Sequence, residues 1–354
     1  MPEEKKQPKI KKPLDPGRHR LITTQETEDD KVVNLSLRPD KMQEFIGQKD
    51  VVANLKVAIS AAKARSEPLE HILLSGPPGL GKTSLAHIIA HEMGTKITST
   101  SGPAIERAGD LIGILTNLGE GDVLFIDEIH RLSKVVEEFL YPAMENSQID
   151  FIIDKGPYAK TIKFNLKRFT LVGATTRAGL LTAPLRSRFG MFFHLDFYES
   201  ADIMQILQRS AKILKIPLDR EASGEVAQRS RGTPRVANRL LRRVRDYAQV
   251  KANNQVNKQV AALALEAQGV DSSGLDNIDR KVITAIIDYY NGGPVGIDSL
   301  AATLNEESDT IVDVVEPFLL KIGYLRRTSR GREVTESACK HLNKPFKGQK
   351  ELFK

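Results

Sequence analysis

Apolar residues follow three different patterns along this chain, and each pattern predicts a different kind of domain. Between residues 37 and 198, short apolar runs alternate with segments of helical periodicity. Strands that are apolar throughout and separated by helices are typical of a parallel sheet covered on both faces. We therefore expect a doubly wound α/β domain over residues 37–198. The predicted strands are His71–Ser75, Val123–Ile126 and Thr170–Gly173, and the predicted helices are Ser84–Glu92 and Val135–Met144.

After residue 198 the strand signals stop and apolar residues recur with a helical period. Ile203, Ile206 and Leu207 show this period first, and Val236, Leu240 and Val244 show it again further along. Such a change predicts a small all-helical domain over residues 199–271.

The last part of the chain, residues 272–354, begins with a Ser-Ser-Gly linker and then changes pattern again. The new pattern predicts three helices followed by two short strands joined by a basic turn, Ser329–Arg332. Three helices followed by a basic hairpin is the layout of a winged-helix domain. The predicted helices are Ile278–Tyr290, Ile297–Leu304 and Asp309–Ile322, and the predicted strands are Tyr324–Thr328 and Glu333–Thr335.

The first 36 residues show little periodic apolar content and are rich in Lys, Pro, Thr and acidic residues, which predicts a disordered basic extension. The length of 354 residues agrees with two or three domains. Cys339 is the single cysteine, which excludes an intrachain disulfide and a cysteine-based zinc cluster. Because neither a signal peptide nor a membrane span is predicted, we expect a cytoplasmic protein without a membrane role.

The net charge of +7 is modest, but it is concentrated in three segments. Residues 1–20 hold seven Lys or Arg against three acidic residues, residues 229–251 hold eight against one, and residues 320–354 hold ten against three. Because the summed net charge of these three segments exceeds the +7 of the whole chain, the rest of the chain carries a net negative charge. Basic patches on an acidic background indicate a polyanion partner.

The segment Gly76–Thr83, with the sequence GPPGLGKT, follows the first predicted strand and leads into a predicted helix. It matches the phosphate-binding pattern G-x-x-x-x-G-K-[ST] in its proper strand–loop–helix context. Glycines let backbone amides surround phosphate oxygens, Lys82 neutralises phosphate charge, and Thr83 is placed to ligate Mg²⁺. The sequence therefore predicts an ATP and Mg²⁺ site.

Two adjacent carboxylates end the predicted strand beside this loop. In a parallel sheet the carboxyl ends of strands face the ligand, so Asp127 is expected to hold Mg²⁺ and Glu128 to orient or deprotonate the attacking water. A third strand ends in Thr175, Thr176 and Arg177, polar residues able to sense a γ-phosphate. His130 is expected to be structural.

Several motifs, taken in their order along the chain, resemble those of the AAA+ ATPases. Their residues resemble the RuvB family in particular. The resemblance runs from about residue 37 to at least residue 335. The AAA+ motifs are Leu37–Pro39, Phe45–Gln48, Ile126–Arg131, Ala174–Arg177, Pro184–Gly190 and Gly232–Arg235. The RuvB-like motifs are Gly79–Thr83, Tyr141–Glu145, Asn238–Asp246 and Gly292–Gly296.

The resemblance implies a set of nucleotide contacts. Leu37 and Arg38 are expected on the adenine side of the pocket, and Tyr198 and Arg235 are expected to contact the nucleotide from the domain junction and the helical lid. The residues implied at the phosphates are Gly79, Gly81, Lys82, Thr83 and Ser84.

The family resemblance also implies contacts between subunits and with partner proteins. Arg188 corresponds to an arginine finger that completes a neighbouring subunit's site, although its sequence position equally allows pairing with a local carboxylate. Thr176 occupies the sensor position, with the adjacent Thr175 as the alternative. The segment Ile149–Asn165 resembles the hairpin that docks on the junction-recognising partner RuvA.

The third helix of the predicted winged domain carries Asp309, Asp313 and Glu316 on one face, which would repel DNA phosphates. DNA contact is therefore expected from the hairpin, whose arginines crowd a short turn without acidic compensation. Contacts to phosphates give binding without sequence preference. The arginines expected at DNA are Arg326, Arg327, Arg330 and Arg332; the resemblance supports Arg327 and Arg332.

Together these features predict a hexameric, ATP-driven motor that pumps duplex DNA and, by resemblance, migrates Holliday junctions in recombination and repair with RuvA, while RuvC resolves them. A clamp-loader-like AAA+ switch is the alternative, but a winged domain in place of a helical collar argues against it. A non-hydrolysing DNA-binding regulator is a third hypothesis; a pure switch needs no water-positioning carboxylate such as Glu128.

Overall fold

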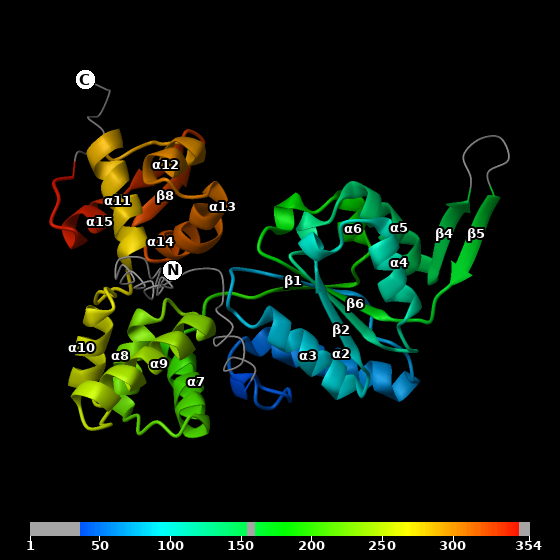
Figure 1. Cartoon of the computed structure of the whole chain (residues 1–354), viewed down its shortest axis with the longest axis horizontal. Coiled ribbons are helices and arrows are strands. Elements are labelled where there is room, and N and C mark those ends of the chain that lie inside the picture. Colours follow the sequence, from blue (N-terminus) through cyan, green and yellow to red (C-terminus); the bar gives the residue numbers. More distant parts are fainter. Residues whose placement is uncertain (1–35, 154–159, 347–354) are drawn as a thin grey trace, which may run out of the picture.

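A computed structural model of the chain describes residues 36–153 and 160–346. The extension predicted for residues 1–36 lies outside these residues apart from its last position. Figure 1 shows a sheet with helices on both sides, a group of helices beside it, and a further group of helices with a small hairpin. We call these parts the α/β domain, the lid and the head.

The α/β domain contains a five-stranded parallel sheet in the order β2-β3-β6-β1-β7. The strands are β1 (Ile72–Ser75), β2 (Ile97–Ser101), β3 (Val123–Asp127), β6 (Thr170–Thr175) and β7 (Met191–His194). The central strand β6 is buried along its whole length, and β1 and β3 are buried except for their last residues, as the apolar runs predict. The predicted doubly wound fold is confirmed, and β6 extends two residues further than expected.

Helices cover both faces of this sheet (Figure 1). One face packs on α2 (Lys49–Arg65) and α3 (Lys82–Met93), and the other on α4 (Ala108–Thr116) and α5 (Lys134–Asn146), followed by the short α6 (Ala183–Ser187). An antiparallel hairpin of β4 (Gln148–Ile153) and β5 (Lys160–Asn165) projects from the end of α5.

The lid consists of α7 (Ser200–Ile213), α8 (Arg220–Arg229), α9 (Pro234–Lys251) and α10 (Lys258–Ala267). Its apolar faces belong to the same cluster of buried side chains as α2, α3 and one face of the sheet. The lid is therefore joined to the α/β domain by a continuous apolar core.

The head has an apolar core of its own. It contains α11 (Asn277–Tyr290), α12 (Ile297–Leu304), strands β8 (Leu325–Thr328) and β9 (Gly331–Val334), and α15 (Glu336–His341). This arrangement confirms the winged-helix prediction.

The third helix of the head is less regular than predicted. It divides into α13 (Ser308–Thr310), a π-helical segment over Ile311–Val315, and α14 (Glu316–Lys321). Pro317 follows the π segment and has no amide hydrogen, so the α-helical hydrogen-bond ladder is interrupted there.

Candidate functional site

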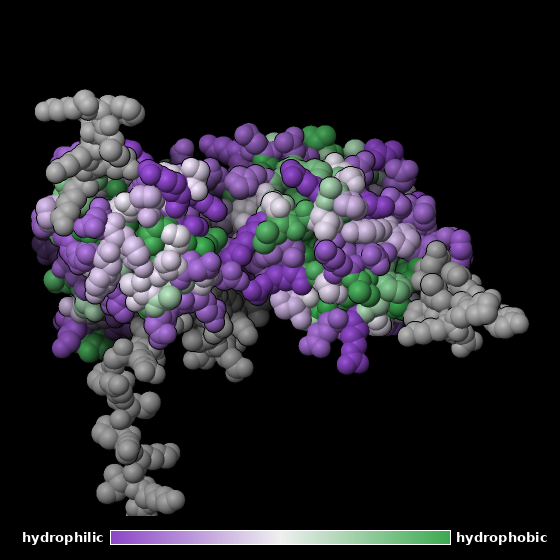
Figure 2. All heavy atoms as spheres, turned by 90° about the horizontal axis from the view of Figure 1, so that it is seen from above, coloured by the Kyte–Doolittle hydropathy of each residue, from purple (hydrophilic) through white to green (hydrophobic). Residues whose placement is uncertain are grey.

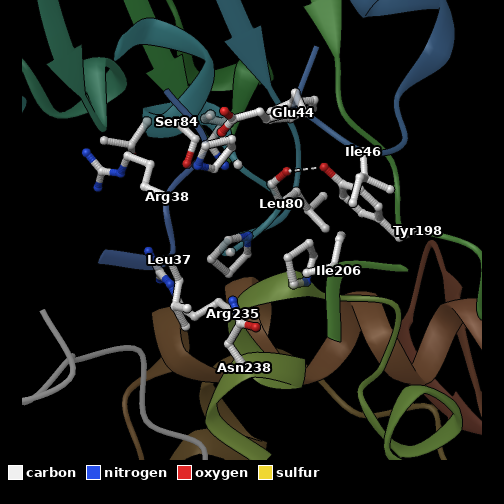
Figure 3. A pocket seen from close by; sticks show the side chains of 18 of the residues that line it. Leu37, Arg38, Glu44, Ile46, Leu80, Ser84, Tyr198, Ile206, Arg235 and Asn238 are labelled. Atoms are coloured by element: carbon white, nitrogen blue, oxygen red, sulfur yellow. Dashed lines mark hydrogen bonds between the residues drawn. The ribbon is translucent and has the colours of Figure 1, made fainter. Parts of the chain in front are cut away.

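A cavity of about 480 Å³ lies between the phosphate-binding loop, the lid and residues 37–46. Figure 3 shows Leu37, Arg38 and Ser84 on one side of it and Arg235 below them. All the predicted nucleotide contacts line this cavity, together with both carboxylates at the end of β3. They are Leu37, Arg38, Gly79, Gly81, Lys82, Thr83, Ser84, Asp127, Glu128, Tyr198 and Arg235.

The phosphate-binding loop takes a shape that requires glycine. Gly79 has a φ of +81°, and a Cβ atom there would lie 2.8 Å from Cγ2 of Thr233 and 2.9 Å from Cβ of Arg235. Glycine therefore allows both the left-handed turn and the close approach of the lid. The loop leads into α3, whose first residue is Lys82 rather than the expected Ser84, so the amides of the first helical turn face the cavity.

The ammonium group of Lys82 is buried at the base of the loop. It donates hydrogen bonds to the carbonyl oxygens of Gly76 at 2.7 Å and Pro77 at 2.9 Å. Burial lowers the pKa of Lys82 to about 8, against the opposing charges of Asp127 and Glu128. A partly desolvated cation in this position is ready to pair with phosphate oxygens.

Asp127 and Glu128 lie at the carboxyl end of β3, as predicted. An oxygen of Asp127 accepts a hydrogen bond from the amide of Glu128 at 3.0 Å, and Glu128 has a φ of +48°, an uncommon conformation for a side-chain-bearing residue. Burial raises the pKa of Glu128, and the charge of Asp127 raises it further. A raised pKa makes this carboxylate a stronger proton acceptor.

Thr175 and Thr176, at the end of β6, make different contacts, which bears on which of them is the sensor residue. Thr176 donates a hydrogen bond to Oε2 of Glu128 at 3.2 Å. Thr175 is fully buried, shares a hydrogen bond of 2.9 Å with Nδ1 of His130, and accepts one from the amide of Arg177. Of the two, Thr176 is the one whose side chain contacts the candidate catalytic carboxylate.

His130 takes part in this network, which sequence reasoning missed. Its Nδ1 atom lies 3.3 Å from Oε2 of Glu128, and burial lowers the pKa of its imidazole. The ring therefore supports Thr175 by a hydrogen bond and lies close to the Glu128 carboxylate. Its position two residues after Glu128 was the available signal.

Two residues reach the cavity from beyond the sheet. The hydroxyl of Tyr198 donates to the carbonyl oxygen of Leu80 at 3.0 Å (Figure 3), and burial raises its pKa. Arg235 lies in the first turn of α9, as predicted, and its amide donates to the carbonyl of Gly79 at 3.4 Å. Thr233 is the N-cap residue of α9, but its side chain forms no capping hydrogen bond.

Arg188 lies outside the cavity lining and pairs within its own domain. It forms an ion pair of 2.8 Å with Glu145, donates to the carbonyl oxygen of Pro184 at 2.6 Å, and lies over the ring of Tyr141 at 4.5 Å. In the single chain, Arg188 therefore pairs with a local carboxylate, which is one of the two roles that its sequence position allowed.

The hairpin of the head requires a correction, because Glu316 supplies the acidic compensation that the sequence analysis did not expect. Arg332 turns inward, is only 9% exposed, and pairs with Oε2 of Glu316 at 2.9 Å. Arg327 is 63% exposed and lies 3.7 Å from Oε1 of the same carboxylate. Arg326 and Arg330 have no acidic partner among the residues that the structure describes.

Two acidic residues of the third head helix have partners that the sequence analysis did not identify. Asp309 and Asp313 pair with Arg131 and Arg177 of the α/β domain. These partners are more than 130 residues away in sequence, so spacing could not reveal them.

Among the described residues, no helix is long and apolar enough to cross a bilayer.

Comparison with known proteins matches three family models, one after another along the chain. Residues 37–195 match the model of the Holliday junction DNA helicase RuvB P-loop domain, residues 198–271 that of the RuvB AAA lid domain, and residues 272–343 that of the RuvB C-terminal winged helix domain.

Individual relatives agree with the family models. A Holliday junction branch migration complex subunit RuvB from Desulfosudis oleivorans is 56% identical over 328 residues, covering 92% of this chain and 96% of that protein. A solved structure described as the Thermotoga maritima RuvB Holliday junction branch migration motor is 50% identical, with a TM-score of 0.82, and covers 88% of this chain and 99% of that one. A point mutant of that protein matches with the same TM-score and identity over 87% of this chain and 98% of its own. The chain described here therefore belongs to the RuvB family of AAA+ P-loop ATPases.

Proposed function

We propose that this chain hydrolyses ATP to drive branch migration of Holliday junctions. The observation that carries this proposal is the single cavity in which a phosphate-binding loop, two strand-end carboxylates and an arginine of the lid converge. Such a site links nucleotide chemistry to the position of a second domain, which is what a motor requires.

Thr83 and Asp127 are proposed to hold Mg²⁺, because both residues line the cavity, both carry side-chain oxygens, and Mg²⁺ prefers oxygen ligands. Bound there, the ion neutralises charge on the β- and γ-phosphates. Lys82 and the loop amides are proposed to bind the same phosphates, and Leu37 and Arg38 to bind the nucleoside.

Glu128 is proposed to orient the attacking water and accept its proton. Its hydrogen bond from Thr176 supports a sensor role for that threonine, because the donor is able to turn between this carboxylate and a γ-phosphate oxygen. Arg235 and Tyr198 are proposed to transmit the state of the nucleotide to the lid.

A ring of six copies is proposed, in which Arg188 of one subunit completes the site of the next. Arg188 is 21% exposed and held over Tyr141, so exchanging Glu145 for a neighbour's phosphate requires no refolding of its helix. The anionic phosphate supplies a stronger partner than a half-exposed carboxylate.

Duplex DNA is proposed to bind the hairpin of the head through Arg326, Arg327 and Arg330. Arg332 is proposed to support Arg327 by occupying Glu316, and to reach phosphate only if that ion pair opens. The projecting β4–β5 hairpin is proposed to dock on RuvA, with RuvC acting on the same junction.

The deciding experiment is movement of a synthetic four-way junction, measured with and without RuvA. The wild type should separate the junction arms with ATP, whereas Lys82→Ala and Arg188→Ala should not, and Arg186→Ala is the matched control. ATP-dependent DNA binding without arm movement would instead indicate a switch of the clamp-loader type.

Mixing the two inactive variants tests the shared site. Random mixing in equal amounts should restore about a quarter of the sites, because an intact loop then meets an intact arginine by chance in a head-to-tail ring. No recovery of ATP turnover would contradict the intersubunit role of Arg188.

A further inference from the structure

The head contacts the α/β domain through an ion-pair cluster of four residues, Arg131, Arg177, Asp309 and Asp313. Nε of Arg177 lies 2.6 Å from Asp313, and its Nη2 lies 2.8 Å from Asp309. The other oxygen of Asp309 lies 3.1 Å from Nη2 of Arg131. Figure 2 shows hydrophilic side chains where the head and the α/β domain meet on this face.

Both arginines belong to the segments that carry the candidate catalytic groups. The amide of Arg131 donates to the carbonyl oxygen of Glu128 at 2.9 Å. Arg177 directly follows Thr176, and its amide donates to Oγ1 of Thr175 at 3.0 Å. A displacement of Arg131 therefore reaches Glu128 through one hydrogen bond, and a displacement of Arg177 reaches Thr176 through the peptide bond between them.

The junction between the head and the lid is of a different kind. Arg231 of the lid pairs with Asp279 and, at 3.1 Å, with Asp276, and it donates to the carbonyl oxygen of Gly274. The side chain of Arg231 is 4% exposed and that of Asp279 is 0% exposed, whereas Arg177 is 23% and Asp309 50% exposed. Buried pairs are costlier to break than partly exposed ones. The ion-pair cluster, in which Arg177 and Asp313 are 23% and 24% exposed, is therefore the weaker of the two contacts of the head.

Docking also changes the charge near the nucleotide. While the head is docked, the guanidinium of Arg177 is occupied by two carboxylates, and the charge of Asp313 extends as far as Lys82. Carboxylates near bound phosphates oppose the charge that hydrolysis develops. Release of the head removes two carboxylates and leaves Arg131 and Arg177 without these partners, in the segments that carry Glu128 and Thr176.

We propose that Arg131 and Arg177 are positioning residues for Glu128 and Thr176, and that the docked head restrains ATP hydrolysis by occupying them. Movement of the lid and head away from the α/β domain then releases both arginines and raises turnover. This inference rests on the catalytic roles proposed above for Glu128 and Thr176.

Substitutions of the aspartates and of the arginines in the cluster should have opposite effects on turnover. A contact with a purely structural role would give the same effect from either side. Asp309→Asn with Asp313→Asn should raise kcat in the absence of DNA about three- to tenfold, as expected for loss of partly exposed ion pairs. Arg177→Ala should not raise kcat, because it frees the head but removes the positioning cation. Added to the aspartate variant, Arg177→Lys should preserve most of the increase. Asp288→Asn, which affects an ion pair with Lys344 inside the head, is the matched control.

Equal effects from both sides of the cluster, or none, would overturn the inference. Melting curves check that the variants fold, and Glu128→Gln separates the two hypotheses. If Glu128→Gln abolishes turnover while the aspartate variant behaves like its control, only the proposed coupling fails. If Glu128→Gln retains turnover, the catalytic assignment fails first.

A covalent lock tests the docked state directly. Arg131→Cys with Asp309→Cys can be joined by a short bismaleimide, because the native Cys339 is buried. The linked protein should turn over ATP more slowly than the same double variant before linking, and DNA should not stimulate it. Full stimulation of the linked protein would refute the coupling.

Discussion

Replacement of Arg231 by leucine should uncouple the head from the lid at a cost that the structure allows us to estimate. Besides its two carboxylate partners, the guanidinium lies 4.9 Å from the ring centre of Phe318. Leucine removes the cation but leaves Asp276 and Asp279 buried. Removing one partner of a buried ion pair typically costs about 3–5 kcal/mol.

The loss should depend on pH. Burial raises the pKa of Asp279 to about 8, and Arg231 opposes this increase. A carboxyl whose pKa is higher in the folded state than in the unfolded chain stabilises the fold at low pH, and that stability is lost as the pH rises from its unfolded pKa towards its folded one. Without Arg231 the folded pKa rises further, so the variant should be weakest above pH 8 and recover towards pH 5.

Hydrogen exchange of the α11 amides measures this local stability. Protection at pH 8 should fall by about two to four orders of magnitude, since each 1.4 kcal/mol corresponds to a factor of ten. Adding Asp279→Leu to Arg231→Leu should restore much of the protection, because no ionised Asp279 then remains buried. A loss below about 1 kcal/mol, or one independent of pH, would show that this junction does not hold the head as argued.

Three further predictions concern the nucleotide and DNA sites. Thr176→Val should lower kcat about tenfold with little change in KM, whereas Thr175→Val should mainly lower the melting temperature, since the Thr175 side chain is fully buried. The reverse pattern in steady-state kinetics and melting curves would assign the sensor role to Thr175. Arg327→Ala should lower the slope of log affinity for duplex DNA against log salt by about one, whereas Arg332→Ala should mainly destabilise the head, because the buried Glu316 then keeps only the longer contact with Arg327. An equal loss of slope with a stable head would show that Arg332 contacts phosphate directly. Nucleotide affinity measured by titration should fall as the pH rises through about 8, because Lys82 loses its charge there, and Lys82→Arg should remove this dependence; a flat profile in the wild type would contradict the lowered pKa.

The fold and the nucleotide cavity could be predicted because their signals are local in the sequence. The loop containing Lys82 and the strand ending in Asp127 each carry their own pattern, and parallel pairing brings strand ends together at one edge of the sheet. The reach of β6 to Thr175 was underestimated because Gly173 and the polar Thr175 interrupt the apolar pattern, although all six residues are buried.

The role of the acids in the third head helix could not be predicted in this way. Asp309 and Asp313 have a helical spacing that identifies a charged face, but nothing in the spacing says whether that face meets DNA, water or another domain. Glu316 lies on the same helix, yet its partners come from the hairpin. Charge patterns predict that a partner exists, and only the tertiary structure identifies it.

The apolar core that the α/β domain shares with the lid bears on how the chain unfolds. Side chains of β1, α3, α7 and α9 belong to one cluster, whereas the head encloses a cluster of its own. Loss of the lid would expose apolar surface of the α/β domain to water, so the two should melt together as one cooperative unit. Heating should therefore give two calorimetric transitions rather than three. A chain cut after residue 271 should remain soluble, and one cut after residue 198 should aggregate.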